Sequence, residues 1–171
     1  MNMRRLFFAF WPDEPLRQAL EAARSRLFPL SGRPVVPADL HVTTAFLGAV
    51  SEARLKALKA LCGPVPPLTL RFDRLEYWPK ARVVVAATTH VPAELRRLVD
   101  GLWQRLDRLG FAREPRPFKP HVTLARDVRS MRPGLTWTPF LWPADRIDLV
   151  ESVATQTGVH YQLNPGGAPP A

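Results

Sequence analysis

The sequence FKPHVTLAR (residues 118–126) contains a tripeptide that also occurs far upstream, in LHVTTAF (residues 40–46). The shared tripeptide is His-Val-Thr, which begins at His41 and again at His121, 80 positions later (121 − 41). The chain has four histidines, so the two copies use half of them. A single copy is ordinary strand sequence, since such short motifs have a high false-positive risk. Two copies in matched settings indicate a shared function.

Each tripeptide, placed on a strand, sends two polar side chains to the same surface. Alternate residues of a strand point to the same face, so His41 and Thr43 project together and Val42 points to the other side. The same holds for His121 and Thr123 around the second valine. Two such strands facing each other would form a cleft that contains two imidazoles and two hydroxyls.

The rest of the chain predicts short strands and amphipathic helices in a mixed order. Apolar spacing and capping signals predict helices over residues 13–27, 51–61 and 92–109. Alternating or continuous apolar runs predict strands over residues 5–10, 40–47, 68–77, 82–89, 121–125, 146–152 and 159–163. We expect Gly48 to end the second strand, and residues 68–77 to pair with residues 82–89. Because no long series of βαβ units is present, the pattern favours an α+β fold with mostly antiparallel sheet.

Length and composition predict one soluble domain. We expect a single domain over residues 1–164 and a flexible Gly/Pro-rich tail over residues 165–171. The single cysteine, Cys62, cannot form an internal disulfide, which favours a cytoplasmic protein. The first apolar run stops at Pro12, too early for a signal peptide or a membrane span. No helix shows a surplus apolar face, so we expect a monomer.

The charge balance favours a polyanionic partner. The chain has 24 basic and 15 acidic residues, a net charge of +9. Such an excess attracts nucleic acid at long range and through counterion release. Most of the basic residues are arginine, whose planar fork suits phosphate oxygens, although a GC-rich genome would also encode an Arg-rich chain. Both explanations of the arginine content stay open.

Two histidines of near-neutral pKa suit the attack of water on phosphorus. One imidazole takes a proton from the water while the other gives a proton to the departing oxygen. Threonine hydroxyls and an arginine would hold the remaining phosphate oxygens. This chemistry needs neither a metal nor a cofactor, and no Cys/His cluster has the spacing of a zinc site.

These motifs resemble the 2H phosphoesterase family, and within it the RNA 2′,3′-cyclic phosphodiesterases, also called 2′-5′ RNA ligases. The resemblance covers nearly the whole chain, in RRLFFAFWP, HVTTAFLG, ARVVVA, KPHVTLAR and a pattern that contains Glu151, Ser152, Gly158 and Tyr161. It implies two similar α+β lobes with mostly antiparallel sheets, related by a pseudo-twofold axis, and an active-site cleft between them.

The resemblance also implies the reaction and the residues. It implies catalysis by His41 and His121, and phosphate binding by Thr43, Thr123 and Arg126. The implied reaction is metal-independent hydrolysis of an RNA-terminal 2′,3′-cyclic phosphate to a 2′-phosphate, with weak, reversible 2′-5′ joining in some members. RNA with a cyclic phosphate end, such as a tRNA fragment, would be the partner.

Neighbouring charges suggest which histidine is the acid, and this is a hypothesis. Asp39 lies two residues before His41 and would raise its pKa, whereas Lys119 lies two residues before His121 and would lower its pKa. His41 is then the proton donor and His121 the proton acceptor, the assignment that the resemblance also suggests.

Three further residues depend on the local path of the strands. Arg126 lies five positions after His121, so simple alternation would send it to the wrong face, and a bulge must return it to the cleft. Phe46 could stack on a terminal base. Thr44 stands where the family usually has leucine, and its core-facing hydroxyl must find a backbone partner.

Two other functions stay open. The chain could hydrolyse small 2′-5′ or cyclic nucleotides in place of RNA ends. It could also be a non-catalytic RNA-binding module that keeps the cleft as an anion pocket. Two intact His-x-Thr motifs argue against the second alternative.

Overall fold

The computed structural model describes residues 2–27, 31–163 and 165. Its strands are β1 (Met3–Phe10), β2 (Arg33–Pro34), β3 (Val42–Ser51), β4 (Gly63–Phe72), β5 (Arg74–Trp78), β6 (Val83–Ala87), β7 (His121–Arg126), β8 (Phe140–Thr155) and β9 (Gly158–Leu163). Its α-helices are α1 (Glu14–Ser25), α2 (Leu55–Lys59) and α3 (Ala93–Arg108). Apart from Pro165, the tail that we expect to be flexible lies outside the described residues.

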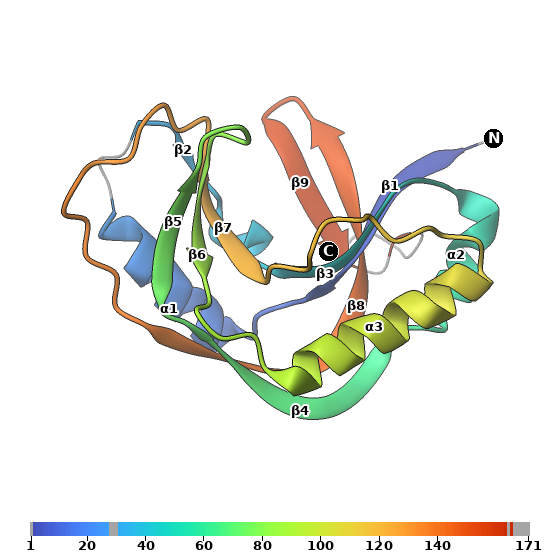
Figure 1. The fold of residues 1–171 in the computed structure, drawn as a ribbon. Helices are drawn as coiled ribbons and strands as arrows, with labels where there is room; N and C mark the ends of the chain where they lie inside the picture. The colour runs from blue at the N-terminus through green and yellow to red at the C-terminus, as the bar shows by residue number, and fades with distance from the viewer. Residues whose placement is uncertain (1, 28–30, 164, 166–171) are drawn as a thin grey trace.

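The described strands form one sheet in which every pairing is antiparallel. The order along the sheet is β4-β8-β1-β3-β7-β6-β5, with β2 added beside β7 and β9 beside β8. Helices α1 and α3 lie at separate positions along the sheet (Figure 1). The predicted α+β class with a mostly antiparallel sheet is confirmed.

The middle of the sheet is its narrowest connection. Strands β3 and β7 pair only at Val42 and Val122, the central residues of the two tripeptides. One half of the sheet, with β1, β8 and β9, diverges from the other half, with β5 and β6, on either side of this contact (Figure 1). That a pseudo-twofold axis relates the two halves stays a prediction.

The main core lies between this sheet and the helices. Leu20 of α1 and Leu102 of α3 are buried in the same cluster as Val42 and Val122. The two valines therefore point toward the helices. The histidines and threonines that alternate with them lie on the opposite face of the sheet.

A β-bulge follows each tripeptide at the same position. In β7, Ala125 and Thr123 pair with neighbouring residues of β6, so Leu124 has no cross-strand partner there. In β3, Ala45 and Thr43 pair with neighbouring residues of β1, so Thr44 is left out in the same way. Leu124 and Thr44 each lie three positions after their histidine.

The two bulges give both strands the same sequence of buried and exposed residues. In both residues 41–46 and residues 121–126, the first three positions are half-buried, buried and half-buried. The next two positions are both buried, and the sixth is exposed. The exposed residues are Phe46 and Arg126, which the bulge returns to the face that carries the histidines. The predicted bulge before Arg126 is confirmed.

Three expectations about the elements are wrong in detail. Strand β3 does not end at Gly48 but continues to Ser51, because Gly48 adopts a φ of 72° beside a second register shift. The strand predicted over residues 68–77 divides at Asp73, whose carboxylate accepts a hydrogen bond from the main chain of Thr89. Its first part, β4, pairs with β8, and only β5 pairs with β6.

The helix predicted from Ser51 is also shorter than expected. Residues Glu52–Arg54 form a 3-10 turn that leads into α2, and Ser51 makes no side-chain capping bond. The helix predicted from Asp13 is confirmed, since the Asp13 carboxylate caps α1 by accepting from the main chain of Leu16 at 2.9 Å.

The hydroxyl of Thr44 does not find the partner that we expected. Thr44 is buried on the core side, and its Oγ1 makes no hydrogen bond within the described part of the chain.

We predict that Thr44→Val raises the free energy of unfolding by about 1 kcal/mol, because valine has the same shape without the unpaired oxygen. Chemical denaturation measures the change.

Thr88 provides a matched control for this substitution. It is buried too, but its hydroxyl donates to the main-chain carbonyl of His90 at 2.5 Å. Thr88→Val should therefore lower stability by about 1 kcal/mol. Equal losses in both variants would contradict our account of Thr44.

Candidate active site

One cavity brings together all the residues expected at the site, Phe46 included. It has a volume of about 690 Å³ and lies over the narrow junction between the two halves of the sheet. His41, His121, Thr43, Thr123 and Arg126 all line it. Two further arginines, Arg5 and Arg33, also line it, and none of its described lining residues is acidic. The cavity is suited to an anion of the size of a nucleotide.

The strand register arranges the histidines and threonines in two facing pairs. Because Val42 is opposite Val122 in an antiparallel pair, His41 lies across from Thr123 and His121 lies across from Thr43. The two histidines are diagonal neighbours, each beside a hydroxyl of the other strand. A phosphate placed between them can contact an imidazole and a hydroxyl from each side.

Hydrogen bonds to the main chain fix the tautomer of both histidines. Nδ1 of His41 donates to the carbonyl of Asp39 at 2.7 Å, and Nδ1 of His121 donates to the carbonyl of Lys119 at 2.8 Å. A carbonyl can only accept, so Nδ1 carries the hydrogen in both rings. Each Nε2 is left to take or give a proton in the cleft. His41 Nε2 lies 3.2 Å from Thr43 Oγ1.

Aromatic side chains pack against each imidazole. Trp11 stacks on His41 with ring centres 5.4 Å apart and planes 9° apart, and Trp78 packs against His121 at 4.6 Å. Phe7 and Tyr161 also contact the His41 ring, at 5.0 and 4.8 Å. The sequence analysis missed Trp11 in this role, because only the turn after β1 brings it beside His41.

Burial lowers the pKa of both histidines. Removal from water lowers the pKa of His41 to about 4, the Asp39 carbonyl opposes this change, and the charges of His121 and Arg126 add to it. Removal from water also lowers the pKa of His121, with the Lys119 carbonyl opposing and the charge of Arg126 adding.

Asp39 raises the pKa of His41, as expected, but through a different group than its charge suggested, and burial outweighs this effect. Asp39 faces His41 through its main-chain carbonyl, while its carboxylate binds elsewhere. The charge of Lys119 does lower the pKa of His121, as expected. Lys119 is itself paired with the Glu76 carboxylate at 2.6 Å, and that carboxylate raises the pKa of His121.

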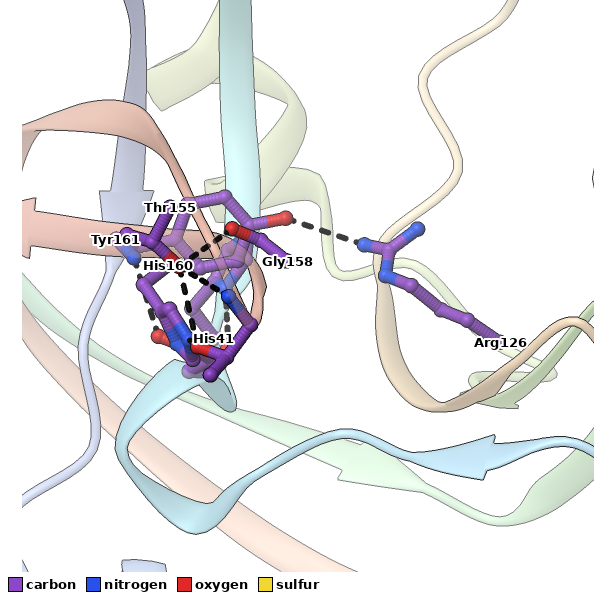
Figure 2. A network of polar contacts seen from close by, with 8 residues as sticks. His41, Arg126, Thr155, Gly158, His160 and Tyr161 are labelled. Carbon is purple, nitrogen blue, oxygen red and sulfur yellow. Dashed lines mark hydrogen bonds and ion pairs between the residues drawn. The ribbon is translucent and has the colours of Figure 1, made fainter.

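The buried Asp39 carboxylate anchors strand β9 beside the cleft. Figure 2 shows the network that follows from this anchor, with His160 and Tyr161 on one side and Arg126 on the other. One oxygen accepts from His160 Nδ1 at 3.0 Å, and the other accepts from the main-chain nitrogen of Tyr161 at 3.1 Å. The Tyr161 hydroxyl in turn accepts from Arg126 at 3.1 Å. Asp39, whose carbonyl orients His41, is thus connected through β9 to the arginine on the other side of the cleft.

Phe46 lies where the first bulge exposes it, at the rim of the cleft. Its side chain is 38% exposed, and the guanidinium of Arg5 lies 4.8 Å from the ring centre. One face of the ring is therefore covered by an arginine. That Phe46 stacks on a base stays a prediction.

Known proteins match both the sequence and the geometry. The family model described as the 2′-5′ RNA ligase superfamily matches residues 12–156. The chain belongs to the 2′-5′ RNA ligase superfamily. This result confirms the resemblance to the 2H phosphoesterases that the paired His-x-Thr motifs indicate.

Individual members of the superfamily are similar over most of their length. The RNA 2′,3′-cyclic phosphodiesterase of Escherichia coli is 38% identical over 142 residues, which are 79% of this chain and 81% of the relative. The Thermus thermophilus protein of the same name is 32% identical, over 93% of this chain and 87% of the relative. The solved structure of E. coli LigT in its apo form superposes with a TM-score of 0.83 at 33% identity, and 95% of each chain is covered.

No group of three or more His, Cys, Asp or Glu side chains in residues 2–27, 31–163 and 165 could hold a metal ion. None of the helices described has the length and apolar character needed to cross a membrane.

The lowered pKa values predict how activity depends on pH. With a pKa of about 4, His41 of the free protein is protonated in roughly one molecule in a thousand at pH 7. If one histidine must be protonated, kcat/KM should fall as the pH rises above neutrality, about tenfold per unit. NMR titration should give both pKa values below 6.5 and should show them rising when inorganic phosphate binds. A kcat/KM profile that is flat through the alkaline range would contradict this expectation.

The Asp39 network predicts a loss of both stability and activity. We expect Asp39→Ala to lower the free energy of unfolding by about 1–3 kcal/mol, since the partners of a buried carboxylate are left unpaired. We also expect it to lower kcat more than it raises KM, because the turn that orients His41 loses its anchor. Asp107→Ala, which removes an exposed carboxylate on α3, is the control and should change neither. Denaturation curves and steady-state kinetics measure both effects.

Proposed function

We propose that this chain is an RNA 2′,3′-cyclic phosphodiesterase that hydrolyses the cyclic end to a 2′-phosphate. The observation that carries the proposal is the pair of imidazoles in one cationic cleft, each with Nδ1 bound to a main-chain carbonyl so that Nε2 is left for proton transfer. The names of the relatives from E. coli and T. thermophilus support the same activity.

The two histidines carry out one proton transfer each. The bound phosphate anion raises the low pKa of His41, which thereby takes up a proton. His121, neutral at Nε2, accepts a proton from water as the water oxygen attacks phosphorus. The bond from phosphorus to O3′ breaks, and His41 gives its proton to O3′. The product has a 2′-phosphate and a free 3′-hydroxyl.

The other cleft residues stabilise the charge on phosphate. Thr43 and Thr123 can each donate a hydroxyl hydrogen to an oxygen that does not take part in bond breaking. Arg126, held by Tyr161, supplies positive charge from the second half of the sheet. These groups and the two imidazoles complete the reaction without a metal ion.

The same geometry permits the joining reaction. A 5′-hydroxyl that takes the place of water would give its proton to His121 and form a 2′-5′ phosphodiester. Hydrolysis and joining would then share the leaving group, O3′, and the acid, His41.

The net positive charge favours RNA over a small nucleotide as substrate. A charge of +9 lowers the free energy of bringing a polyanion to the cleft. We expect an oligoribonucleotide with a cyclic end to have a higher kcat/KM than a cyclic mononucleotide, and this advantage to shrink as salt is added.

The decisive test follows the product by phosphorus NMR. An oligoribonucleotide with a 2′,3′-cyclic phosphate end is incubated in excess EDTA with the wild type, His41→Ala and His121→Ala. We expect the wild type to form a 2′-phosphate, and each variant to lose about 10²–10⁴-fold in rate.

His90 is the matched control, because it is an exposed histidine that lines neither the catalytic cavity nor its neighbour. His90→Ala should keep the wild-type rate. A wild type that binds the RNA without turnover would instead support a non-catalytic RNA-binding module. Formation of a 3′-phosphate would refute the assignment of O3′ as the leaving group.

A further inference from the structure

A second cavity opens beside the catalytic one, on the side of His121. It has a volume of about 550 Å³, within the range of about 300–1,000 Å³ that is usual for ligand pockets. His121 and Thr43 line both cavities, whereas His41 lines only the first. A molecule in the second cavity would therefore reach the reacting phosphorus past His121.

The walls of this second cavity combine aromatic rings with cationic side chains. Trp78 and Phe118 are half-buried and provide ring surface, whereas Trp103 is buried and forms part of the wall from the core. Arg113 and Arg116 provide guanidinium groups, and Glu114 also lines the cavity. Stacking rings and arginines are the usual partners of single-stranded nucleic acid. The cavity thus suits a nucleoside with an attached phosphodiester.

The arginines of this cavity are available to a ligand. The side chains of Arg116 and Arg113 are 84% and 38% exposed. Their carboxylate partners, Glu114 and Asp100, are also more than half exposed, so a phosphate can replace them at little cost.

The segment that carries these arginines is well suited to present them. Residues 111–120 connect α3 to β7 without helix or strand, and Figure 1 shows them passing β3. Pro115, Pro117 and Pro120 restrict the backbone of this segment. Less freedom is therefore lost when a ligand binds.

The direction of attack gives this cavity a function. In a displacement at phosphorus the nucleophile enters opposite the leaving oxygen, so the base and the acid lie on opposite sides. With His121 as base, the second cavity lies where the nucleophile enters. A water molecule needs no cavity of this size, but an RNA strand that ends in a hydroxyl does.

We infer that the second cavity binds the 5′-hydroxyl end of an acceptor RNA strand, and so makes it a competitor of water for the cyclic phosphate. The inference rests on the proposed function. The 5′-oxygen attacks phosphorus, its proton passes to His121, the bond to O3′ breaks, and O3′ takes the proton of His41. The product is a 2′-5′ phosphodiester, and no other reactant is consumed.

The test measures how the cyclic phosphate divides between two products. The donor is an oligoribonucleotide with a cyclic phosphate at one end and a phosphorylated 5′ end, so that it cannot act as acceptor. The acceptor has a free 5′-hydroxyl and a 3′-phosphate. The ratio of joined to hydrolysed donor is measured at one acceptor concentration. Because both products come from the same active sites, this ratio does not depend on the fraction of protein that is folded.

The double variant Arg113→Ser/Arg116→Ser should lower this ratio about tenfold, which corresponds to about 1.4 kcal/mol of acceptor binding. Arg105→Ser/Arg108→Ser removes the same charge from exposed positions of α3 outside both cavities and should keep the wild-type ratio. An unchanged ratio in the first variant would overturn the inference. If the first variant keeps the wild-type ratio but has a higher KM for the donor, the cavity holds the donor strand, and the inference is again overturned.

The proposed function and this inference fail in different ways. If the wild type forms no 2′-phosphate, the proposed function is wrong. If the wild type hydrolyses the donor but never joins it to the acceptor, the proposed function stands and the acceptor site is refuted.

Discussion

The pairing of Val42 with Val122 is the contact on which the rest of the site depends. It joins the two halves of the sheet at one point and fixes their register there. A shift of either strand by a single residue would turn its histidine into the core and its valine into the cleft. Because the two valines are buried in the main cluster under the helices, burial of apolar surface opposes such a shift. Packing beneath the sheet thus determines the chemistry above it.

In the free protein, the positive charge of the cleft comes from its arginines and not from its two histidines. Both imidazoles have a lowered pKa and pack against aromatic side chains, and arginines contribute the permanent positive charge. In the free protein, therefore, the histidines are mostly neutral at pH 7. Binding of the phosphate anion itself would charge one of them, so the acid would form only when substrate is present.

Much of the site could be predicted from the sequence because strand geometry is simple. Alternation places His41 and Thr43 on one face, and the odd offset of Arg126 requires a bulge, which the strand register confirms. The roles of Asp39 and Trp11 could not be predicted, since they depend on contacts between segments far apart in the chain. Asp39 meets β9, 121 positions away, and the sequence does not indicate that its carboxylate turns from His41 to His160.

The fold was predictable to a similar extent, and for related reasons. Helix α3 and strands β1 and β7 follow from local apolar spacing. The division of the strand predicted over residues 68–77 depends instead on Asp73, whose carboxylate binds a distant backbone nitrogen. Pairing of β4 with β8 is a long-range choice that local pattern does not contain.

The paired bulges also give the cleft a direction. Each bulge exposes the residue five positions after its histidine, and these residues differ, with Phe46 in the first strand and Arg126 in the second. Two strands with the same backbone therefore present an apolar side chain at one end and a cation at the other. A repeated backbone thereby forms a cleft whose two ends differ in side-chain chemistry.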